Sequence, residues 1–357
     1  MARFLVLGAG VMGTAFSYVP ADAGSQVDLV GTHLDGDEIE GLQSTGRHPR
    51  LPTAVPPGIR AHHLDAFADL LAEGPDVLVL GVSSPGVEWA IERIVEAAGG
   101  GHGTSDGVPG AEPMPTPAPQ GLPPIVMLTK GLDVSTGAPR IFPHRVVEAL
   151  QDAGLASAGV GAIGGPCIAG ELARRVHSNV VLGGPKNGAI SGLRNRLRSD
   201  YYHIQSTTDL IGLEVSAALK NFYTIGIAAG GSEDGSVHNP SAALFAQAAR
   251  EMARVAEQLG GDPATAFGLA GVGDLYVTCR AGRNSRLGAH LAGGLTYSEI
   301  RTEKMPWDTI EGADLALALD SVDFFKGLED EFPLATAILA SVCEDRPFQG
   351  PWEALTS

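Results

Sequence analysis

Two lysines lie in surroundings that could give them a chemical role. Lys220 interrupts an apolar stretch, 210–230, whose length and composition are typical of a buried helix. Burial penalises the ammonium form and lowers the pKa of a lysine toward the range that general acid–base catalysis uses. Lys130 directly follows an apolar run, 124–129, that is typical of a buried strand. At the carboxyl end of such a strand, a lysine could donate a hydrogen bond to a substrate oxygen.

Each lysine also has a purely structural interpretation. Lys220 could pair with Glu214 of the same helix or extend its ammonium group to solvent, and Lys130 could be a solvated loop residue. The chain has only five lysines among 24 basic residues, so a lysine with apolar neighbours needs an explanation. Neither interpretation is excluded by these residues alone.

A third group of polar residues lies between positions 271 and 286. It combines a carboxylate, Asp274, a hydroxyl, Thr278, and a guanidinium, Arg283, which is followed by Asn284. A guanidinium can hold a phosphate with two hydrogen bonds, and a helix beginning here would add free backbone N–H groups. Asp274 could orient a lysine through an ion pair. A polar loop that caps the next helix would account for Asn284 equally well.

Glycines near the start of the chain form a GxGxxG pattern. Gly8, Gly10 and Gly13 follow the apolar run 4–7 and open a helical pattern that begins at about Met12. In a strand–turn–helix unit the first glycine makes the tight turn, the second lets the backbone approach a pyrophosphate, and the third allows close helix–strand packing. We therefore expect a dinucleotide cofactor, NAD or NADP.

The end of the second expected strand, 27–30, bears on the choice between these cofactors. Enzymes that bind NAD usually have an acidic residue here, which holds the ribose. This strand ends instead in Gly31-Thr32-His33, with Asp28 too early and Asp35 too late. The choice stays open, with a preference for tolerance of the phosphorylated form. Taken with the lysines and the Arg-Asn pair, the cofactor predicts hydride transfer to a small phosphorylated carbonyl compound.

Strands alternate with helices in the first part of the chain, and long helices follow. Expected strands lie at 4–7, 27–30, 76–82, 124–129, 159–163 and 179–182, with a helix at 87–97 between two of them. This order predicts a parallel sheet built from βαβ units. Helices are expected at 209–230, 240–260, 285–292, 311–318 and 333–343. We expect an α/β protein, with a Rossmann-like parallel-sheet domain at 1–206 and an all-α substrate domain at 207–357.

The segment 99–124 is rich in Gly, Pro and Ser, which predicts a flexible insertion.

Composition excludes several classes of protein. Acidic residues outnumber basic ones 41 to 24 in the 357-residue chain, and the resulting charge of -17 disfavours binding to nucleic acid or anionic membrane. Charged residues within 210–230 argue against a membrane span, and glycines break the apolar start of the chain, which fits a signal peptide poorly. The three cysteines form no metal-binding or disulfide pattern. We expect a cytoplasmic protein without a bound metal.

Taken in order, the motifs resemble those of the NAD(P)-dependent sn-glycerol-3-phosphate dehydrogenase family. They cover most of the chain: GxGxxG from Gly8, T-K-G-L from Thr129, G-G-P-x-x-A-x-E-L from Gly164, G-x-E-x-x-A-A-L-K-N from Gly212, G-L-A-G-x-G-D-L-x-x-T-C from Gly268, and G-R-N-x-R-x-G from Gly282. A-L-K-N is specific to this group, because related 3-hydroxyacid dehydrogenases place the catalytic lysine and asparagine apart. The resemblance implies a Rossmann-like domain with an all-helical domain, often in a homodimer. It also implies interconversion of glycerol 3-phosphate and dihydroxyacetone phosphate.

The resemblance implies roles for individual residues. Lys220 would be the general acid/base at the C2 oxygen of the substrate, Lys130 would bind and polarise that oxygen, and Asp274 would orient the lysine. The substrate would also contact the side chains of Asn221, Thr278, Arg283 and Asn284. The cofactor would be held by Gly8, Gly10, Val11, Met12, Gly13, His33, Lys130, Arg283 and Glu311.

Departures from the family pattern leave other functions open. The family's G-P-S/T-F-A is Gly165-Pro166-Cys167-Ile168-Ala169 here, and two arginines common after A-L-K-N in bacterial members are replaced by Ser241 and Gln247. Loss of cations near a phosphate pocket would fit the same chemistry on a different short polyol or keto phosphate. A third hypothesis is a non-catalytic NAD(P)H-binding sensor, although the expected catalytic groups are all present.

Overall fold

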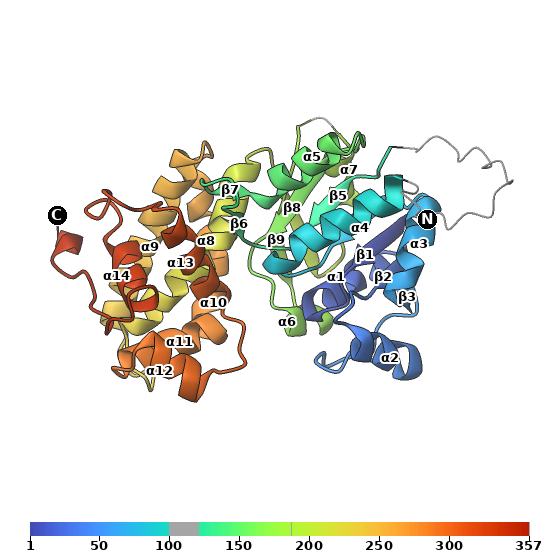
Figure 1. Ribbon diagram of the computed structural model, residues 1–357. Coiled ribbons are helices and arrows are strands. Elements are labelled where there is room, and N and C mark those ends of the chain that lie inside the picture. Colours follow the sequence, from blue (N-terminus) through green and yellow to red (C-terminus); the bar gives the residue numbers. More distant parts are fainter. Residues whose placement is uncertain (100–120, 187, 357) are drawn as a thin grey trace, which may run out of the picture. The chain divides into compact units, whose positions relative to one another are not determined.

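The chain forms two compact units. The computed structural model describes residues 1–99, 121–186 and 188–356, so most of the expected insertion at 99–124 lies outside the described residues (Figure 1). The first unit comprises 1–129, 143–163 and 167–208, and the second comprises 130–142, 164–166 and 209–357. Each unit has its own hydrophobic core. The segments 130–142 and 164–166, which the sequence assigned to the first domain, thus belong to the second unit.

An eight-stranded sheet in the order β10-β9-β8-β5-β4-β1-β2-β3 forms the centre of the first unit. The strand pairs whose register is described are all parallel. The strands are β1 (Arg3–Leu7), β2 (Gln26–Val30), β3 (Ile59–His62), β4 (Val77–Leu80), β5 (Ile125–Met127), β8 (Val160–Gly164), β9 (Ser178–Gly183) and β10 (Tyr202–Thr207). The order of β3-β2-β1-β4-β5 is the Rossmann arrangement, which confirms the expected fold of this domain.

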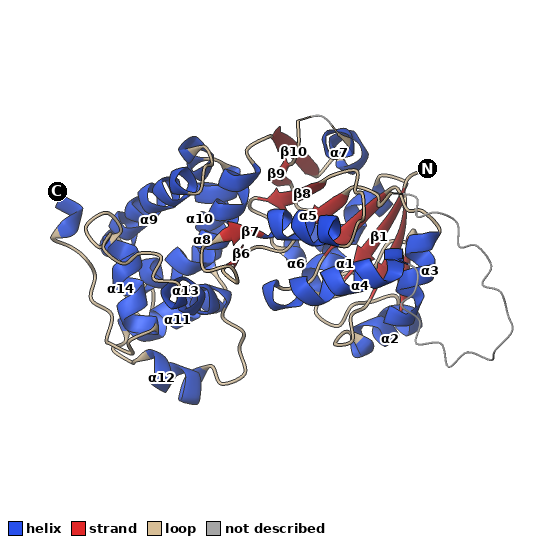
Figure 2. Ribbon diagram, turned by 45° about the horizontal axis from the view of Figure 1, so that its top comes forward, coloured by secondary structure: helices blue, strands red, loops and turns tan. Residues whose placement is uncertain are grey.

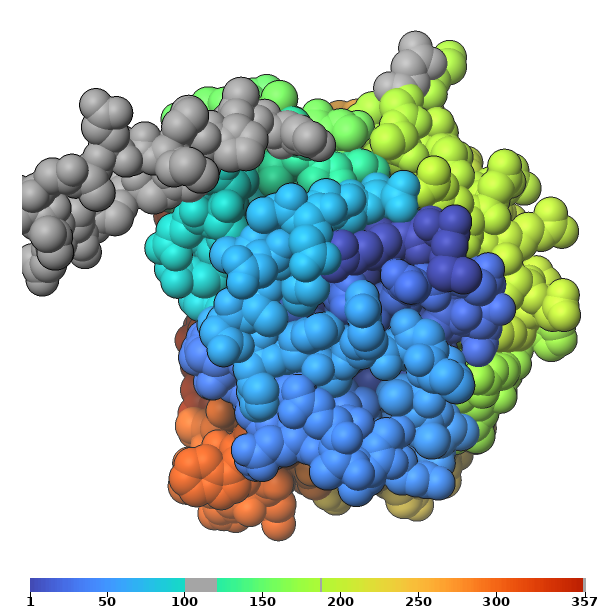
Figure 3. Space-filling view, turned by 90° about the vertical axis from the view of Figure 1, so that its right-hand side faces the viewer, coloured from blue at the N-terminus to red at the C-terminus, as the bar shows by residue number. Residues whose placement is uncertain are grey.

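Helices flank this sheet (Figure 2). They are α1 (Val11–Asp22), α2 (Gly36–Thr45), α3 (Phe67–Ala72), α4 (Val87–Gly99), α5 (Phe142–Asp152), α6 (Ala169–Ala173) and α7 (Ala189–Leu197). Helix α1 packs with α6 and α7, and α3 packs with α4. Figure 3 shows the side of this unit that carries α2 and α3, where N-terminal residues form the surface. Strand β4 consists of Val and Leu alone, and β1 is apolar and buried after Arg3, as expected for a parallel sheet covered on both faces.

The second unit is a helical bundle around α8 (Leu210–Ala229). Its other helices are α9 (Asn239–Gln258), α10 (Asp274–Arg280), α11 (Arg283–Ala292), α12 (Tyr297–Glu299), α13 (Glu311–Ser321) and α14 (Pro333–Val342). A short antiparallel hairpin of β6 (Leu132–Asp133) and β7 (Arg140–Ile141) packs against α8. The six expected strands and six expected helices of the chain are confirmed, each within three residues of its expected bounds.

Helix α8 is the buried centre of this bundle. It begins at Leu210 after Asp209, whose carboxylate accepts a hydrogen bond from the backbone N–H of Gly212 at 2.9 Å and so caps the helix. Helices α9, α10, α11, α13 and α14 all pack against it, which explains why it is apolar on every side. Within the described residues, no helix is both long enough and apolar enough to cross a bilayer.

Candidate active site

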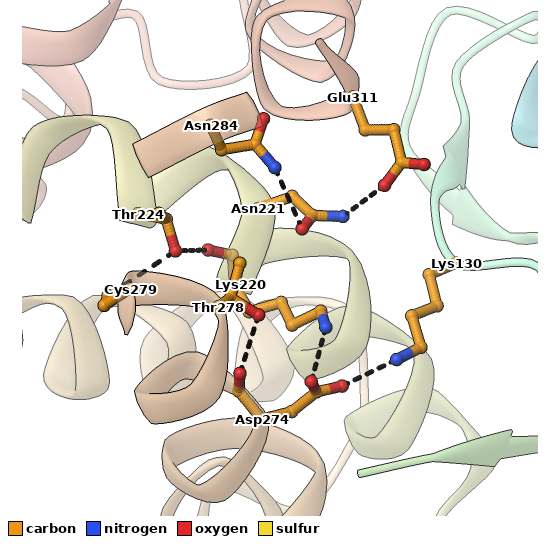
Figure 4. Close-up of polar contacts among 9 residues, drawn as sticks. All are labelled: Lys130, Lys220, Asn221, Thr224, Asp274, Thr278, Cys279, Asn284 and Glu311. Atoms are coloured by element: carbon orange, nitrogen blue, oxygen red, sulfur yellow. Dashed lines mark hydrogen bonds and ion pairs between the residues drawn. The ribbon is translucent and has the colours of Figure 1, made fainter. Parts of the chain in front are cut away.

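Two lysines and one aspartate form a buried ion-pair cluster in the second unit (Figure 4). Lys220 projects from the middle of α8, and Asp274 is the first residue of α10. One carboxylate oxygen of Asp274 accepts a hydrogen bond from Lys220 Nζ at 2.5 Å, and the other accepts one from Lys130 Nζ at 2.7 Å. The side chains of Lys220 and Asp274 are 9% and 2% exposed, while that of Lys130 is 19% exposed. Asp274 therefore holds both ammonium groups at one place.

Burial and charge set the protonation of this cluster. Burial, and then the positive charge of Lys130, lowers the pKa of Lys220 to about 8, although Asp274 acts in the opposite direction. Burial favours the neutral form of Asp274, but the charges of Lys130 and Lys220 outweigh it, so the pKa of this carboxyl lies below its usual value. Near neutral pH, Asp274 is thus an anion, and Lys220 can change its protonation close to physiological conditions. These are the electrostatics that an acid/base lysine requires.

A second hydrogen-bonded chain runs beside the cluster through two asparagines. Asn221 Nδ2 donates to Glu311 Oε2 at 2.9 Å, and Asn284 Nδ2 donates to Asn221 Oδ1 at 3.1 Å. Asn284 Oδ1 in turn accepts from the backbone N–H of Gly312 at 2.9 Å. This chain fixes the orientation of both amides and ties the starts of α11 and α13 to α8. Arg283, the first residue of α11, lies 3.7 Å from Glu311 and is about half exposed, so its guanidinium is accessible to an anion.

Two hydroxyl groups support the cluster from within its helices. Thr278 Oγ1 donates to the backbone carbonyl of Asp274 at 2.7 Å, and Thr224 Oγ1 donates to that of Lys220 at the same distance. Thr224 also lies 3.6 Å from Cys279 Sγ. The sequence singled out Thr278 but not Thr224, because a threonine inside a buried helix carries no signal of its own beyond its spacing of four from Lys220.

The glycine-rich turn of the first unit lies where the sheet order reverses, between β1 and β4. Gly8 has φ of +112°, and a Cβ there would lie 2.8 Å from the backbone of Gly81, which follows β4. A Cβ on Gly13 would lie 2.1 Å from the carbonyl oxygen of Gly8. A Cβ on Gly10, at the start of α1, would by contrast meet no atom within 4 Å. The turn is thus closely packed at Gly8 and Gly13 and open at Gly10, which fits a pyrophosphate bound at the N-terminus of α1.

Asp35 approaches this turn, which its position in the sequence did not suggest. Its Oδ2 accepts hydrogen bonds from the backbone N–H groups of Ala9 at 3.0 Å and Thr32 at 2.8 Å. The earlier acid, Asp28, is fully buried and pairs with Arg3, Arg60 and His62, so it is a structural residue. Asp35 directly precedes α2. Because aspartate is common at helix N-termini, where it accepts hydrogen bonds from backbone N–H groups, its place before a helix was the signal that could have indicated such a role.

His33 is the sequence candidate at the end of β2. Its ring lies 5.2 Å from that of Trp89 on α4, in a tilted arrangement. His33 belongs to the first unit, as do Val11 and Met12 at the start of α1, whereas Lys130, Arg283 and Glu311 belong to the second.

Gly10→Ala directly tests whether the glycine-rich turn binds a pyrophosphate. We expect the variant to fold with a stability within about 1 kcal/mol of the unaltered protein, since its backbone conformation suits any residue. The added methyl group would occupy the open space at the start of α1, and NAD(H) or NADP(H) affinity should fall about tenfold or more. Titration of cofactor fluorescence measures this. Gly192→Ala on α7, which likewise has no atom within 4 Å, is the matched control and should bind normally. Unchanged affinity of Gly10→Ala would contradict a pyrophosphate site at this turn.

The residues that replace the two family arginines have other neighbours in the described part of the chain. Gln247 Nε2 donates to Glu251 Oε1 at 2.8 Å inside the bundle. Ser241 lines a cavity of about 640 Å³, together with Phe245, Tyr276 and Arg280. The geometry therefore gives no support to a changed substrate based on these two positions.

Glu251 itself joins two helices. Its carboxylate is fully buried and accepts hydrogen bonds from the backbone N–H groups of Leu334 and Ala335, at 2.8 and 2.9 Å, at the start of α14. Glu251→Ala leaves these donors unsatisfied, and we expect it to lower the free energy of unfolding by about 2–4 kcal/mol. Urea denaturation measures this loss. The neighbouring surface variant Glu257→Ala should cost less than about 0.5 kcal/mol, and equal losses in the two variants would contradict the assigned role.

A Rossmann sheet with an open glycine turn, together with a helical unit that holds a buried lysine–aspartate cluster, is typical of two-domain NAD(P)-dependent dehydrogenases. Models of the NAD-dependent glycerol-3-phosphate dehydrogenase N-terminus and C-terminus match residues 4–189 and 209–351. The chain belongs to this family.

Individual relatives agree with the family models. A protein from Archaeoglobus fulgidus named NADP(+)-dependent glycerol-3-phosphate dehydrogenase is 32% identical over 306 residues, which are 84% of this chain and 82% of the relative. A glycerol-3-phosphate dehydrogenase [NAD(P)+] from Thermobifida fusca is 29% identical over 99% of this chain and 96% of its own length. The crystal structure of a glycerol-3-phosphate dehydrogenase from Coxiella burnetii is 26% identical with a TM-score of 0.75, and the match covers 99% of this chain and 98% of that one.

Proposed function

We propose that this protein interconverts sn-glycerol 3-phosphate and dihydroxyacetone phosphate by hydride transfer with NAD or NADP. The observation that carries the proposal is the pairing of Lys220 and Lys130 with the two oxygens of Asp274. This pairing places a titratable lysine beside a fixed cation. Reduction of a ketone uses the first to transfer a proton to the carbonyl oxygen and the second to polarise the carbonyl group. The family and its named relatives support the choice of substrate.

Lys220 is the general acid in reduction of the ketone and the general base in oxidation of the alcohol. In reduction its ammonium group gives a proton to the C2 oxygen, and in oxidation the neutral amine takes that proton back. Lys130 donates a hydrogen bond to the same oxygen and stabilises the negative charge that develops there. Asp274 orients both lysines and lowers the cost of their burial. When bound, the nicotinamide ring supplies the hydride at C2 or accepts it.

Phosphate and cofactor are held by the remaining candidates. Arg283 is half exposed and begins α11, so it offers a bidentate guanidinium and a helix N-terminus to a phosphate. Asn284, Asn221 and Thr278 complete the substrate contacts in this proposal, and Glu311 contacts the cofactor. Gly8, Gly10, Val11, Met12 and Gly13 hold the pyrophosphate, with His33 nearby at the end of β2.

The dependence of turnover on the phosphate group of the substrate tests the substrate assignment. Initial rates with NAD⁺ and NADP⁺ should be high for sn-glycerol 3-phosphate and lower by at least about a hundredfold in kcat/KM for glycerol, because a bidentate phosphate contact is lost. A panel of four- and five-carbon polyol phosphates, assayed in parallel, covers the second substrate class. Faster turnover of one of those compounds, or equal turnover of glycerol, would overturn the proposal.

The roles of the two domains, the cellular location and the oligomeric state form part of the same proposal. We propose that the first unit, the sheet domain expected at 1–206, acts as the dinucleotide-binding domain, and that the second unit, the helical domain expected at 207–357, acts as the substrate-binding domain, in a cytoplasmic homodimer. The family supports the dimer, and the charge of -17 supports a protein that avoids nucleic acid and anionic membranes. Sedimentation velocity measures the oligomeric state, and a mass near 36.8 kDa at all concentrations would overturn the dimer.

A further inference from the structure

The cavity of about 640 Å³ in the second unit has no assigned role. Its walls come from the C-terminal end of α8, the start of α9, and the helices α10 and α11. Many of its lining residues are small, among them Ala228, Gly231, Ser241 and Ala289, which leaves space between these elements. Binding sites for small molecules commonly have volumes of about 300–1,000 Å³. The cavity is therefore large enough to hold a small organic ligand.

Arg280 brings a positive charge to the wall of this cavity. Other polar groups of the wall are engaged: the carboxylate of Glu233 lies 3.1 Å from the ring of His290, and Ser285 Oγ donates to the backbone carbonyl of Cys279 at 2.8 Å. Arg280, the last residue of α10, forms no side-chain hydrogen bond or ion pair within the part of the chain that the structure describes. Its planar guanidinium is thus available to bind an anion with two parallel N–H donors.

The start of α9 adds a second attraction for an anion. This 20-residue helix begins at Asn239, and His238 before it makes no side-chain hydrogen bond to the first turn. The backbone N–H groups of that turn therefore have no side-chain cap, and the helix dipole favours negative charge beside them. His238 and Ser241, which lies in the first turn, both line the cavity. An anion in the cavity would thus meet the positive end of this helix as well as Arg280.

Apolar side chains line the same cavity. Phe245 packs against the core of the helical unit and also lines the cavity. Tyr276 and Val237, two further lining residues, are 59% and 43% exposed. Covering apolar surface of this kind removes it from water and stabilises a complex. The cavity therefore suits a ligand that has both an apolar body and an anionic group.

We propose that this cavity binds a small monocarboxylate with an apolar body, such as an aryl or short alkyl carboxylate. The carboxylate accepts two hydrogen bonds from Arg280, and the apolar body packs against Phe245 and Tyr276. A monoanion is favoured over a dianion, because Arg280 supplies a single positive charge and the chain as a whole carries a charge of -17. The residues that line the cavity include neither Lys220 nor Asp274, so this inference does not depend on the proposed reaction.

Fluorine NMR with para-trifluoromethylbenzoate as the probe tests the proposal. We expect saturable binding, and an affinity at least about tenfold lower for neutral para-trifluoromethylbenzyl alcohol, which cannot form the charge-assisted hydrogen bonds. Arg280→Gln should weaken binding of the benzoate by a similar factor. Arg250→Gln is the matched control, since Arg250 is an exposed arginine of α9 that does not line the cavity. Absence of saturable binding, or equal affinities of Arg280→Gln and the unaltered protein, would overturn the proposal.

Competition and a filled cavity locate the bound probe. Saturating sn-glycerol 3-phosphate with NADH should leave the benzoate bound, and its displacement would place the probe in the substrate site and overturn the proposal. Ala242→Phe should abolish binding because Ala242 lines the cavity, whereas Ala243→Phe, at an exposed position of α9 outside it, should not. Equal binding by these two variants would overturn the proposal. So would a bound fraction that falls as protein concentration rises, since a second copy of the chain would then cover the cavity. These measurements need no turnover, so their failure is distinguishable from failure of the proposed reaction.

Discussion

Lys220→Met should lower kcat for dihydroxyacetone phosphate reduction by about 10²–10⁴-fold, the usual contribution of a positioned general acid. Methionine replaces the unbranched stem of lysine without its amino group and suits a buried helix, but it can neither donate a proton to the C2 oxygen nor accept one from it. Asp274 keeps its ion pair with Lys130 in this variant, so the rest of the cluster retains a counter-ion. Stopped-flow or steady-state absorbance of the nicotinamide measures the loss.

A change confined to chemistry distinguishes this role from a structural one. Cofactor affinity should be retained, because the glycine turn that binds the pyrophosphate belongs to the other unit. Lys326→Met is the matched control: this lysine is 71% exposed and pairs with Asp323 on the surface, so the variant should turn over normally. Normal kcat in a folded Lys220→Met protein would contradict the assignment of Lys220 as the acid/base.

Asp274→Asn should damage both stability and catalysis, since it removes the carboxylate that accepts hydrogen bonds from both lysines. Loss of this carboxylate breaks both ion pairs, and breaking a buried ion pair by removing one partner costs about 3–5 kcal/mol. Because Asp274 raises the pKa of Lys220, its loss should lower that pKa further below about 8. Lys220 would be largely neutral at pH 7, so reduction of the ketone should slow at least about a hundredfold.

The pH dependence of the Asp274→Asn variant provides a second test. The pKa of Asp274 is lowered in the folded protein, so the stability that this carboxylate confers is complete above its unfolded pKa of about 3.9. That stability is lost as the pH falls through the folded value. The difference in urea midpoint between Asp274→Asn and the unaltered protein should therefore shrink once the acid is strong enough to protonate Asp274 in the folded protein. Equal stability of the two proteins at neutral pH would show that the ion pairs are not formed.

The sequence predicted the centre of each unit better than its edges. Strands such as β1 and β4 are buried on both faces, so their unbroken Val and Leu runs are recognisable without other information. The sheet ends at β3 and β10, which the sequence analysis missed. Both are edge strands with exposed or half-buried polar residues, and their short mixed sequences resemble loops.

The residues of the candidate site were likewise predictable only in part. Lys220 and Asp274 could be singled out because a charge inside an apolar segment, or beside a glycine-rich turn, is rare enough to notice. Their shared pairing with Lys130 depends on a segment, 130–142, that leaves the sheet and joins the helical unit, and no local pattern predicts such a crossing. For Asp35 and Gln247 the sequence was misleading. The position of Asp35 suggested an acid too late to matter for the cofactor, but its carboxylate accepts a hydrogen bond from the N–H of Ala9. The position of Gln247 suggested an altered phosphate pocket, but its amide donates a hydrogen bond to Glu251.

Oxidation of NADH and NADPH by dihydroxyacetone phosphate, followed at the nicotinamide absorbance, tests the central claim most directly. The protein should first be shown to bind each cofactor, so that absence of turnover cannot reflect an empty cofactor site. We predict turnover with at least one cofactor, which falls by about 10²–10⁴-fold in Lys220→Met and persists in Lys326→Met. Tight cofactor binding without oxidation of either cofactor would contradict the account, and would leave a dinucleotide-binding protein that does not reduce this ketone.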